Sequence, residues 1–289
     1  MKNPPLIVAL TLLCAGCSGL ENDSETRVPE KSGAEQVDAD QQYKRSAFPH
    51  EYINDCELAC VVGDFPRHIN LKTSPAPTPL PATAFRFTVK SYNDAIAAIP
   101  GGTGPQAVVV HNGLGATNRM ELAFEFVRLK PMGGDEYSYD PPNHHYVING
   151  STLTRQNGPV ENWKTTFWQR YKNGIVFRDT PTSSWRDHDP AKDVEYIVYS
   201  HDAKLRMLIA HNAMTDSDLL EIKPVAEPLN GVTDFRQGLV WVPTNVSIAS
   251  RPGPNGDFHL QAADIGSPCP KACPPNIVLR TTGVAVRCC

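Results

Sequence analysis

The densest group of chemically reactive side chains in the sequence is the run Trp185-Arg186-Asp187-His188-Asp189-Pro190. Asp187 and Asp189 flank His188, so these three side chains could bind a cation or act as general acid and base. Runs of this composition are also typical of turns, in which Asp side chains bond their own backbone. The sequence therefore offers Asp187, His188 and Asp189 as candidate catalytic residues of a hydrolase, with a turn as the alternative.

Other motifs that could carry chemistry give little support to an enzyme. His144 and His145 are adjacent in a predicted strand, where neighbouring side chains point to opposite faces and cannot share one ion. The run His111-Asn112-Gly113-Leu114-Gly115 lacks the last glycine of a phosphate-binding loop. The chain contains no Gly-x-Ser-x-Gly, Ser-x-x-Lys or His-Glu-x-x-His motif. We expect no cofactor and no resident metal.

Aromatic residues crowd one region of the sequence and could form a binding surface. Tyrosine and tryptophan rings can stack on sugar rings or anchor a protein partner, and they can equally fill a hydrophobic core. The sequence leaves open whether the rings stack on a ligand or fill the core for four candidate residues: Trp163, Trp168, Tyr171 and Trp185.

The N-terminus carries the features of a cleaved export signal. Lys2 precedes an apolar stretch of eleven residues, LIVALTLLCAG, at positions 6–16. Crossing a hydrocarbon core of roughly 30 Å takes about 20 residues, so this stretch suits a signal peptide better than a membrane anchor. The run Leu13-Cys14-Ala15-Gly16-Cys17 resembles the lipobox of bacterial lipoproteins. This resemblance covers residues 1–18 only.

The resemblance implies that residues 1–16 are removed and that Cys17 carries the lipid. Ser18, rather than Asp, is the residue type associated with the outer membrane in that family. Cys14 departs from the usual pattern, which has Leu three residues before the modified cysteine. An ordinary cleaved secretory signal is the alternative. Stable attachment requires two or more acyl chains, because each buried methylene contributes only about 0.8 kcal/mol.

The region after the signal is predicted to be a flexible acidic tether, residues 17–48. Seven acidic residues oppose two basic ones between positions 18 and 42, and large apolar side chains are almost absent there. The whole chain has a formal charge of −4, of which this segment contributes −5 and Lys2 contributes +1, so the remainder is neutral. A neutral domain lacks the clustered positive charge that nucleic-acid binding requires, so no nucleic-acid partner is expected.

Six further cysteines lie near the two ends of the predicted domain, which spans residues 49–289. An even number in an exported protein predicts disulfide bonds. We expect at least one bridge between the two ends, which would close a loop of roughly 200 residues and contribute about 5 kcal/mol. Zinc binding by the two Cys-x3-Cys pairs is the alternative. The six are Cys56, Cys60, Cys269, Cys273, Cys288 and Cys289.

Short strands dominate the predicted secondary structure. Alternating apolar residues indicate a strand at 85–89, and the AVVV run indicates another at 107–110. Asn-Gly pairs suit tight turns, which predicts hairpins over 144–155 and 167–178. A third hairpin is predicted over 195–210. Later strands are predicted at 239–242, 246–248, 277–280 and 284–286.

Helical segments are predicted at 91–99 and 215–223, while residues 120–129 fit both patterns and a strand is slightly favoured. The proline-rich segment 74–83 is interpreted as an extended linker, with a peptide motif as the alternative. Together these patterns predict a mainly β fold: an antiparallel β-sandwich or barrel-like domain with one or two short helices.

The leading functional hypothesis is an outer-membrane-anchored lipoprotein that faces the periplasm or the cell surface. Its β-rich domain would bind a protein or glycan of the envelope, surface or surroundings, or have a structural role. The alternative is an exported, possibly metal-assisted hydrolase. Clustering of His188 with His111, His144 or His259 would favour the enzyme, and an exposed aromatic face would favour the binding domain.

Overall fold

The structure is a computed structural model. It describes residues 52–53, 55–81, 85–133, 136–190, 193–229, 234–244, 262–263, 267–270 and 277–278. All of these residues belong to one compact unit, Asp38–Cys289. Strand accounts for 43% of the well-defined region and helix for 23%, which confirms the predicted mainly β fold with a few short helices.

Two antiparallel sheets form the body of this unit. The first has five strands, in the order β1 (Tyr52–Ile53), β15 (Ala262–Ala263), β14 (Asp234–Pro243), β13 (Leu219–Leu229) and β4 (Phe85–Thr88). The second has six strands, in the order β10 (Thr152–Asn157), β9 (His144–Asn149), β6 (Met120–Arg128), β5 (Gln106–Leu114), β12 (Val194–Ser200) and β16 (Ser267–Pro270).

Two smaller sheets and five α-helices complete the described architecture. The small sheets are β11 (Ile175–Phe177), β2 (Ile69–Leu71) and β3 (Thr78–Pro79), and β17 (Ile277–Val278), β8 (Glu136–Ser138) and β7 (Lys130–Gly133). The helices are α2 (Asp55–His68), α3 (Val89–Ala97), α4 (Val160–Lys164), α5 (Phe167–Gly174) and α6 (Arg206–His211), and a π-helical turn η1 (His201–Leu205) precedes α6.

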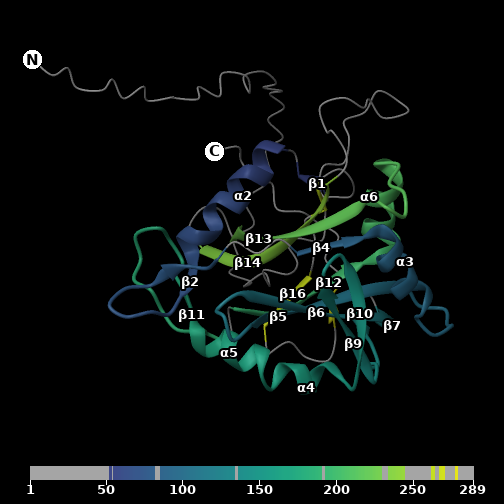
Figure 1. Ribbon diagram of the computed structural model, residues 1–289, viewed down its shortest axis with the longest axis horizontal. Helices are drawn as coiled ribbons and strands as arrows, with labels where there is room; N and C mark the ends of the chain where they lie inside the picture. Colours follow the sequence, from purple (N-terminus) through teal and green to yellow (C-terminus); the bar gives the residue numbers. More distant parts are fainter. Residues whose placement is uncertain are drawn as a thin grey trace, which may run out of the picture. The chain divides into compact units, whose positions relative to one another are not determined.

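The core lies between the two main sheets, because alternate residues of their strands point toward each other. Phe87 of β4 and Trp241 of β14 meet Phe124 of β6, with the Phe87 and Phe124 ring centroids 5.8 Å apart. All three side chains are fully buried. Helix α2 lies along β13 and β14, and α4 and α5 lie below the second sheet in Figure 1. The sheets are therefore enclosed between helices.

Several predicted elements are confirmed. The strand predicted at 107–110 is part of β5, and residues 120–128 form β6, which pairs with β5 from Gln106↔Arg128 to Leu114↔Met120. Helix α3 agrees with the helix predicted at 91–99. The hairpin over 144–155 is formed by β9 and β10, and Gly150 has the positive φ of 62° that its turn requires.

Three predicted elements are wrong. Residues 167–174 form helix α5, so the predicted hairpin over 167–178 is absent. The first strand of the hairpin predicted over 195–210 is part of β12, but its second strand is wrong: residues 201–211 form η1 and α6, because Leu205 and Leu208 are buried at helical spacing. The helix predicted at 215–223 is mostly β13, in which Leu220 and Ile222 enter the core while Glu221 accepts a hydrogen bond from Arg86 on the other face.

Several predictions fall wholly or partly outside the described residues. The tether 17–48, Cys17, His259 and the strands at 246–248 and 284–286 lie in undescribed segments. Cys56 and Cys60 lie on α2 and Cys269 lies on β16, but the side chains of these and the other cysteines are not described, so the disulfides stay predictions. The proline-rich segment contains β3, which pairs with β2.

Candidate functional site

The candidate catalytic residues Asp187, His188 and Asp189 have different surroundings. The His188 ring packs against Trp168 (centroids 5.2 Å apart) and Phe177 (6.0 Å), and neither of its buried nitrogens has a hydrogen-bond partner. Burial lowers the pKa of His188. The Asp187 carboxylate pairs with Lys72 at 2.5 Å on the surface. The alternative of a turn explains this run better, because the Asp189 backbone N–H donates to Asp193.

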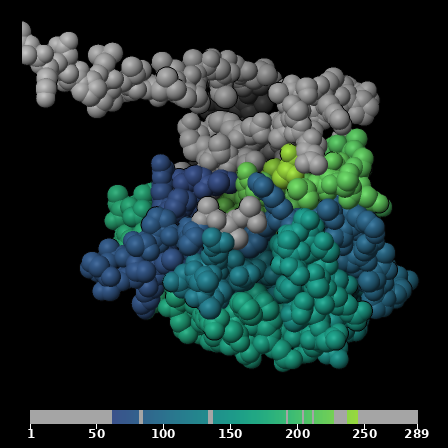
Figure 2. Space-filling model, viewed as in Figure 1, coloured from purple at the N-terminus to yellow at the C-terminus, as the bar shows by residue number. Residues whose placement is uncertain are grey.

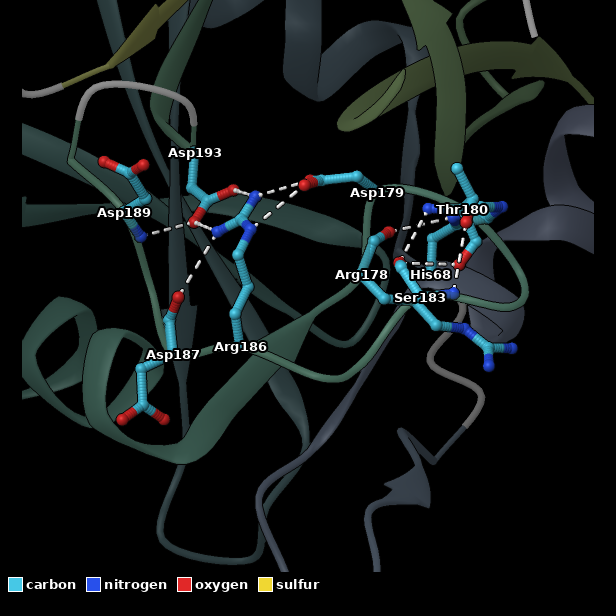
Figure 3. Close-up of polar contacts among 9 residues, drawn as sticks. All are labelled: His68, Arg178, Asp179, Thr180, Ser183, Arg186, Asp187, Asp189 and Asp193. Atoms are coloured by element: carbon cyan, nitrogen blue, oxygen red, sulfur yellow. Dashed lines mark hydrogen bonds and ion pairs between the residues drawn. The ribbon is translucent and has the colours of Figure 1, made fainter. Parts of the chain in front are cut away.

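Arg186 organises this loop from its centre, as Figure 3 shows. Its guanidinium donates to both carboxylate oxygens of Asp193, at 2.7 and 2.9 Å, and to Asp179 Oδ1 at 3.1 and 3.3 Å. Burial opposes the charge of Arg186, but the hydrogen bonds to Asp193 and Asp179 outweigh it and raise its pKa. The carboxylates of Asp187 and Asp189 point away from Arg186. This cluster of side chains therefore holds the loop together.

The candidate stacking residues offer no exposed aromatic platform. Trp163, Trp168 and Tyr171 are at most 8% exposed, so their rings belong to the core. Trp185 is half-buried, and the guanidinium of Arg178 covers its ring at 4.6 Å from the centroid. Core packing, the alternative from the sequence, describes Trp163, Trp168 and Tyr171.

The described histidines whose clustering with His188 would favour an enzyme have separate surroundings. His145 is buried and its Nδ1 lies 3.1 Å from the Gly158 carbonyl oxygen, whereas His144 is half-buried on the opposite face of β9. His111 Nε2 lies 2.8 Å from Glu125 Oε2, which also accepts a hydrogen bond from Tyr139. Within the described ranges, no group of three or more His, Cys, Asp or Glu side chains could hold a metal ion.

Cavities of about 480, 370 and 680 Å³ open on the described surface, and in the first two the charged side chains already contact other groups of the protein. In a cavity of about 480 Å³, Arg128 donates to the carbonyls of Pro100 and Gly104, and Lys130 pairs with Asp140. In a cavity of about 370 Å³, Lys90 pairs with Asp94. A ligand in either cavity would have to compete with these contacts.

In the third cavity, of about 680 Å³, most polar side chains have no partner among the described residues, although Thr165 Oγ1 donates to the carbonyl of Asn162. This cavity lies between the turn from β5 to β6 and the segment of α4 and α5, which forms the lower surface in Figure 2. Among the described residues, Asn118, Thr166, Gln169, Arg170 and Asn173 find no side-chain hydrogen bond or ion pair. The cavity is shallow and broadly open to solvent. This α5 cleft is lined by Leu114, Gly115, Ala116, Asn118, Thr165, Thr166, Gln169, Arg170, Asn173 and Gly174.

The local sequence explains how α5 presents these polar groups. One face of α5 and its N-cap is polar. It carries residues at the spacing i, i+3, i+4, i+7, namely Thr166, Gln169, Arg170 and Asn173. Trp168 and Tyr171 lie on the other face and are buried. The pair Asn173-Gly174 was interpreted as a hairpin turn, so a strand was expected over 167–171. This polar helix face was therefore not predicted.

Two glycines allow the helical segment to approach β5. A Cβ atom at Gly113 would lie 2.4 Å from Trp163 Cη2 and 2.8 Å from Phe167 Cβ. A Cβ atom at Gly174 would lie 2.9 Å from Leu114 Cδ2. The wall of the cleft is therefore close-packed, and side chains at these positions would push α4 and α5 outward.

Arg170 is the one charged side chain among the described residues that line the α5 cleft. Glu121 is exposed, and its Oε1 would lie 2.9 Å from a Cβ atom at Gly115, a residue of the lining. Partial burial of the carboxyl group raises the pKa of Glu121, while the charge of Arg119 partly opposes this rise. The cleft thus offers amides, hydroxyls and one cation, which suits hydrogen bonding to a polar ligand.

Comparison with known protein families, with curated proteins and with solved structures gives no match to this chain. Across the described parts of the chain, none of the helices has the length and apolar character needed to cross a membrane.

Proposed function

We propose that this protein is an outer-membrane lipoprotein, anchored through acyl chains on Cys17, whose β-rich domain binds a glycan in the α5 cleft. The observation that carries the binding proposal is the set of unengaged amide, hydroxyl and guanidinium groups in a cavity of about 680 Å³. Polar groups that project into a cleft without internal partners are available to a ligand rich in hydroxyl groups. The lipid anchor rests on the lipobox-like residues 13–17.

A glycan fits the cleft better than a protein partner does. Protein interfaces depend on buried aromatic or aliphatic anchors at their centre. Among the described residues, Met132 is the one large hydrophobic side chain that is exposed, and it lies outside the α5 cleft. The polar stripe Thr166, Gln169, Arg170 and Asn173 instead supplies donors and acceptors at several positions along one helix face.

Binding fits the cleft better than hydrolysis. Glycosidases generally place two carboxyl groups on either side of the scissile bond. None of the described lining residues is acidic, and Glu121, beside Gly115, would supply a single carboxyl group.

The binding proposal is tested by titrating the full processed chain, purified in detergent, with a panel of neutral and acidic oligosaccharides in a calorimeter. The wild type should bind at least one of them. The double variant Gln169→Ala, Asn173→Ala should lose affinity at least about tenfold, since two ligand hydrogen bonds of about 1 kcal/mol each disappear. Asn143→Ala, an exposed asparagine outside the cleft, is the matched control. No binding by any sugar, or equal binding by the double variant, would contradict the proposal.

The anchor is tested by growing cells with an alkyne-tagged fatty acid. The wild type and the control Cys14→Ser should both become labelled and stay in the membrane fraction, whereas Cys17→Ser should be unlabelled and leave it. An unlabelled wild type, or Cys17→Ser that stays membrane-bound, would overturn the lipoprotein assignment.

A further inference from the structure

We infer that the ligand of the α5 cleft is an acidic glycan whose carboxylate is bound by Arg170. This inference rests on the proposed glycan-binding function and names the class of glycan. It follows from the position of Arg170 in the cleft, from its lack of a protein partner and from the groups that surround it.

Arg170 carries a charge that the described protein does not neutralise. It is exposed, lines the cleft and forms no hydrogen bond or ion pair through its side chain with the described residues. Arg86 pairs with Glu221, and Arg128 donates to two carbonyl groups. Other exposed arginines such as Arg155 resemble Arg170 in having no side-chain partner among the described residues, but they lie outside the cleft. A guanidinium left unpaired inside a cleft can therefore bind an anion without first breaking an internal contact.

The neighbours of Arg170 favour a charged sugar over a simple inorganic anion. Thr166 lies one turn before Arg170 on the same helix face, and Gln169 and Asn173 adjoin it in the same stripe. A guanidinium presents a planar fork of N–H donors that matches a carboxylate in a two-point hydrogen-bonded pair. The flanking hydroxyl and amide groups would bind the ring hydroxyls, so one helix face contacts both parts of an acidic sugar.

An acidic residue beside the lining does not pair with Arg170. Glu121 is exposed next to Gly115 and forms no ion pair with Arg170. The described lining itself contributes no carboxylate. The counter-charge for Arg170 in the complex therefore comes from the ligand.

The test uses matched sugar pairs that differ in the carboxylate: oligogalacturonate and its methyl ester, sialyllactose and lactose, and a hyaluronan oligosaccharide and its carboxyl-reduced form. Binding to the full processed chain in detergent is measured by calorimetry. In at least one pair, the acidic member should bind at least about tenfold more tightly, which corresponds to about 1.4 kcal/mol. Arg170→Gln should remove this difference, because it weakens binding of the acidic member at least about tenfold more than binding of the neutral member. Arg170→Lys should retain part of the difference.

Arg155→Gln, an exposed arginine on β10 outside the cleft, is the matched control and should behave like the wild type. Equal binding of acidic and neutral members in every pair, or an unchanged preference in Arg170→Gln, would overturn the acidic-glycan inference while the glycan-binding function stands. Tighter binding of glucose 6-phosphate than of every acidic sugar would also overturn it, in favour of a phosphate ligand. Binding of no sugar at all would overturn the proposed function as well.

Discussion

Arg186 and Arg170 lie on neighbouring parts of the chain and have opposite surroundings. The guanidinium of Arg186 is held by two carboxylates, and its partner Asp193 is only 3% exposed. Arg170 faces the α5 cleft without a side-chain partner among the described residues. A charge that the fold has already satisfied stabilises structure, whereas one left unsatisfied in a cleft is available for binding. The comparison also explains why the sequence run around Arg186, although rich in reactive groups, is a poor site.

The largest predicted effect is on stability at Arg186. Arg186→Met should lower the free energy of unfolding by about 3 kcal/mol, because it leaves the buried Asp193 carboxylate without its cation. Arg170→Met should change it by less than about 0.5 kcal/mol, since the exposed side chain has no internal partner. Urea denaturation of both variants measures the difference. Equal losses of unfolding free energy in Arg186→Met and Arg170→Met would contradict the contrast between the two arginines.

A smaller effect is predicted at the wall of the cleft. Gly113→Ala should destabilise the protein by about 1–3 kcal/mol and weaken sugar binding, because the new Cβ atom would collide with Trp163 and Phe167. Gly63→Ala on α2 is the matched control, since a Cβ atom there meets nothing within 4 Å. That change should stabilise the protein by about 0.5–1 kcal/mol through helix propensity. Thermal unfolding and calorimetry test both variants, and a Gly113→Ala protein with wild-type stability would refute the close packing.

The smallest effect is a pH dependence in the loop of Arg186. Burial lowers the pKa of His188 below its value in the unfolded chain, so the unfolded state binds a proton more readily. Stability that is present above about pH 6.5 should therefore be lost as pH falls below it, with a slope of at most about 1.4 kcal/mol per pH unit for this histidine. Urea denaturation at pH 7.5 and 5.5 should show a smaller loss in His188→Phe than in the wild type.

Three other histidines contribute to the same trend. Burial also lowers the pKa values of His68, His144 and His201, so the wild type should lose stability on acidification even without His188. The test therefore compares how much unfolding free energy the wild type and His188→Phe each lose between pH 7.5 and pH 5.5. An identical loss in His188→Phe would show that His188 does not titrate with folding.

The parts of the fold that the sequence predicts are those with strong local signals. The alternation in 85–89 and the Asn149-Gly150 turn identify β4 and the β9–β10 hairpin, because strand alternation and turn geometry are set by neighbouring residues. Helix α5 was missed, since Asn173-Gly174 is also a turn signal and tertiary packing of Trp168 and Tyr171 decides the outcome.

The candidate site was harder to predict than the fold. The cleft joins Asn118, in the turn after β5, to residues of α5, and this juxtaposition depends on how the helix packs against the sheet. The role of Arg186 depends on Asp179 and Asp193, which lie outside the run 185–190. A sequence shows which groups could react, and it does not show which of them the fold has already paired.

The most direct test of the account is an NMR titration that observes the Nε–H groups of the arginines in ¹⁵N-labelled protein, with oligosaccharide from the matched pairs. Arg186 Nε donates to Asp179, so its signal should be protected and unchanged by the sugar. The Arg170 signal should shift on addition of the acidic member and much less with the neutral member. A shift at Arg186 in place of Arg170, or binding that leaves Arg170 unchanged, would contradict the account.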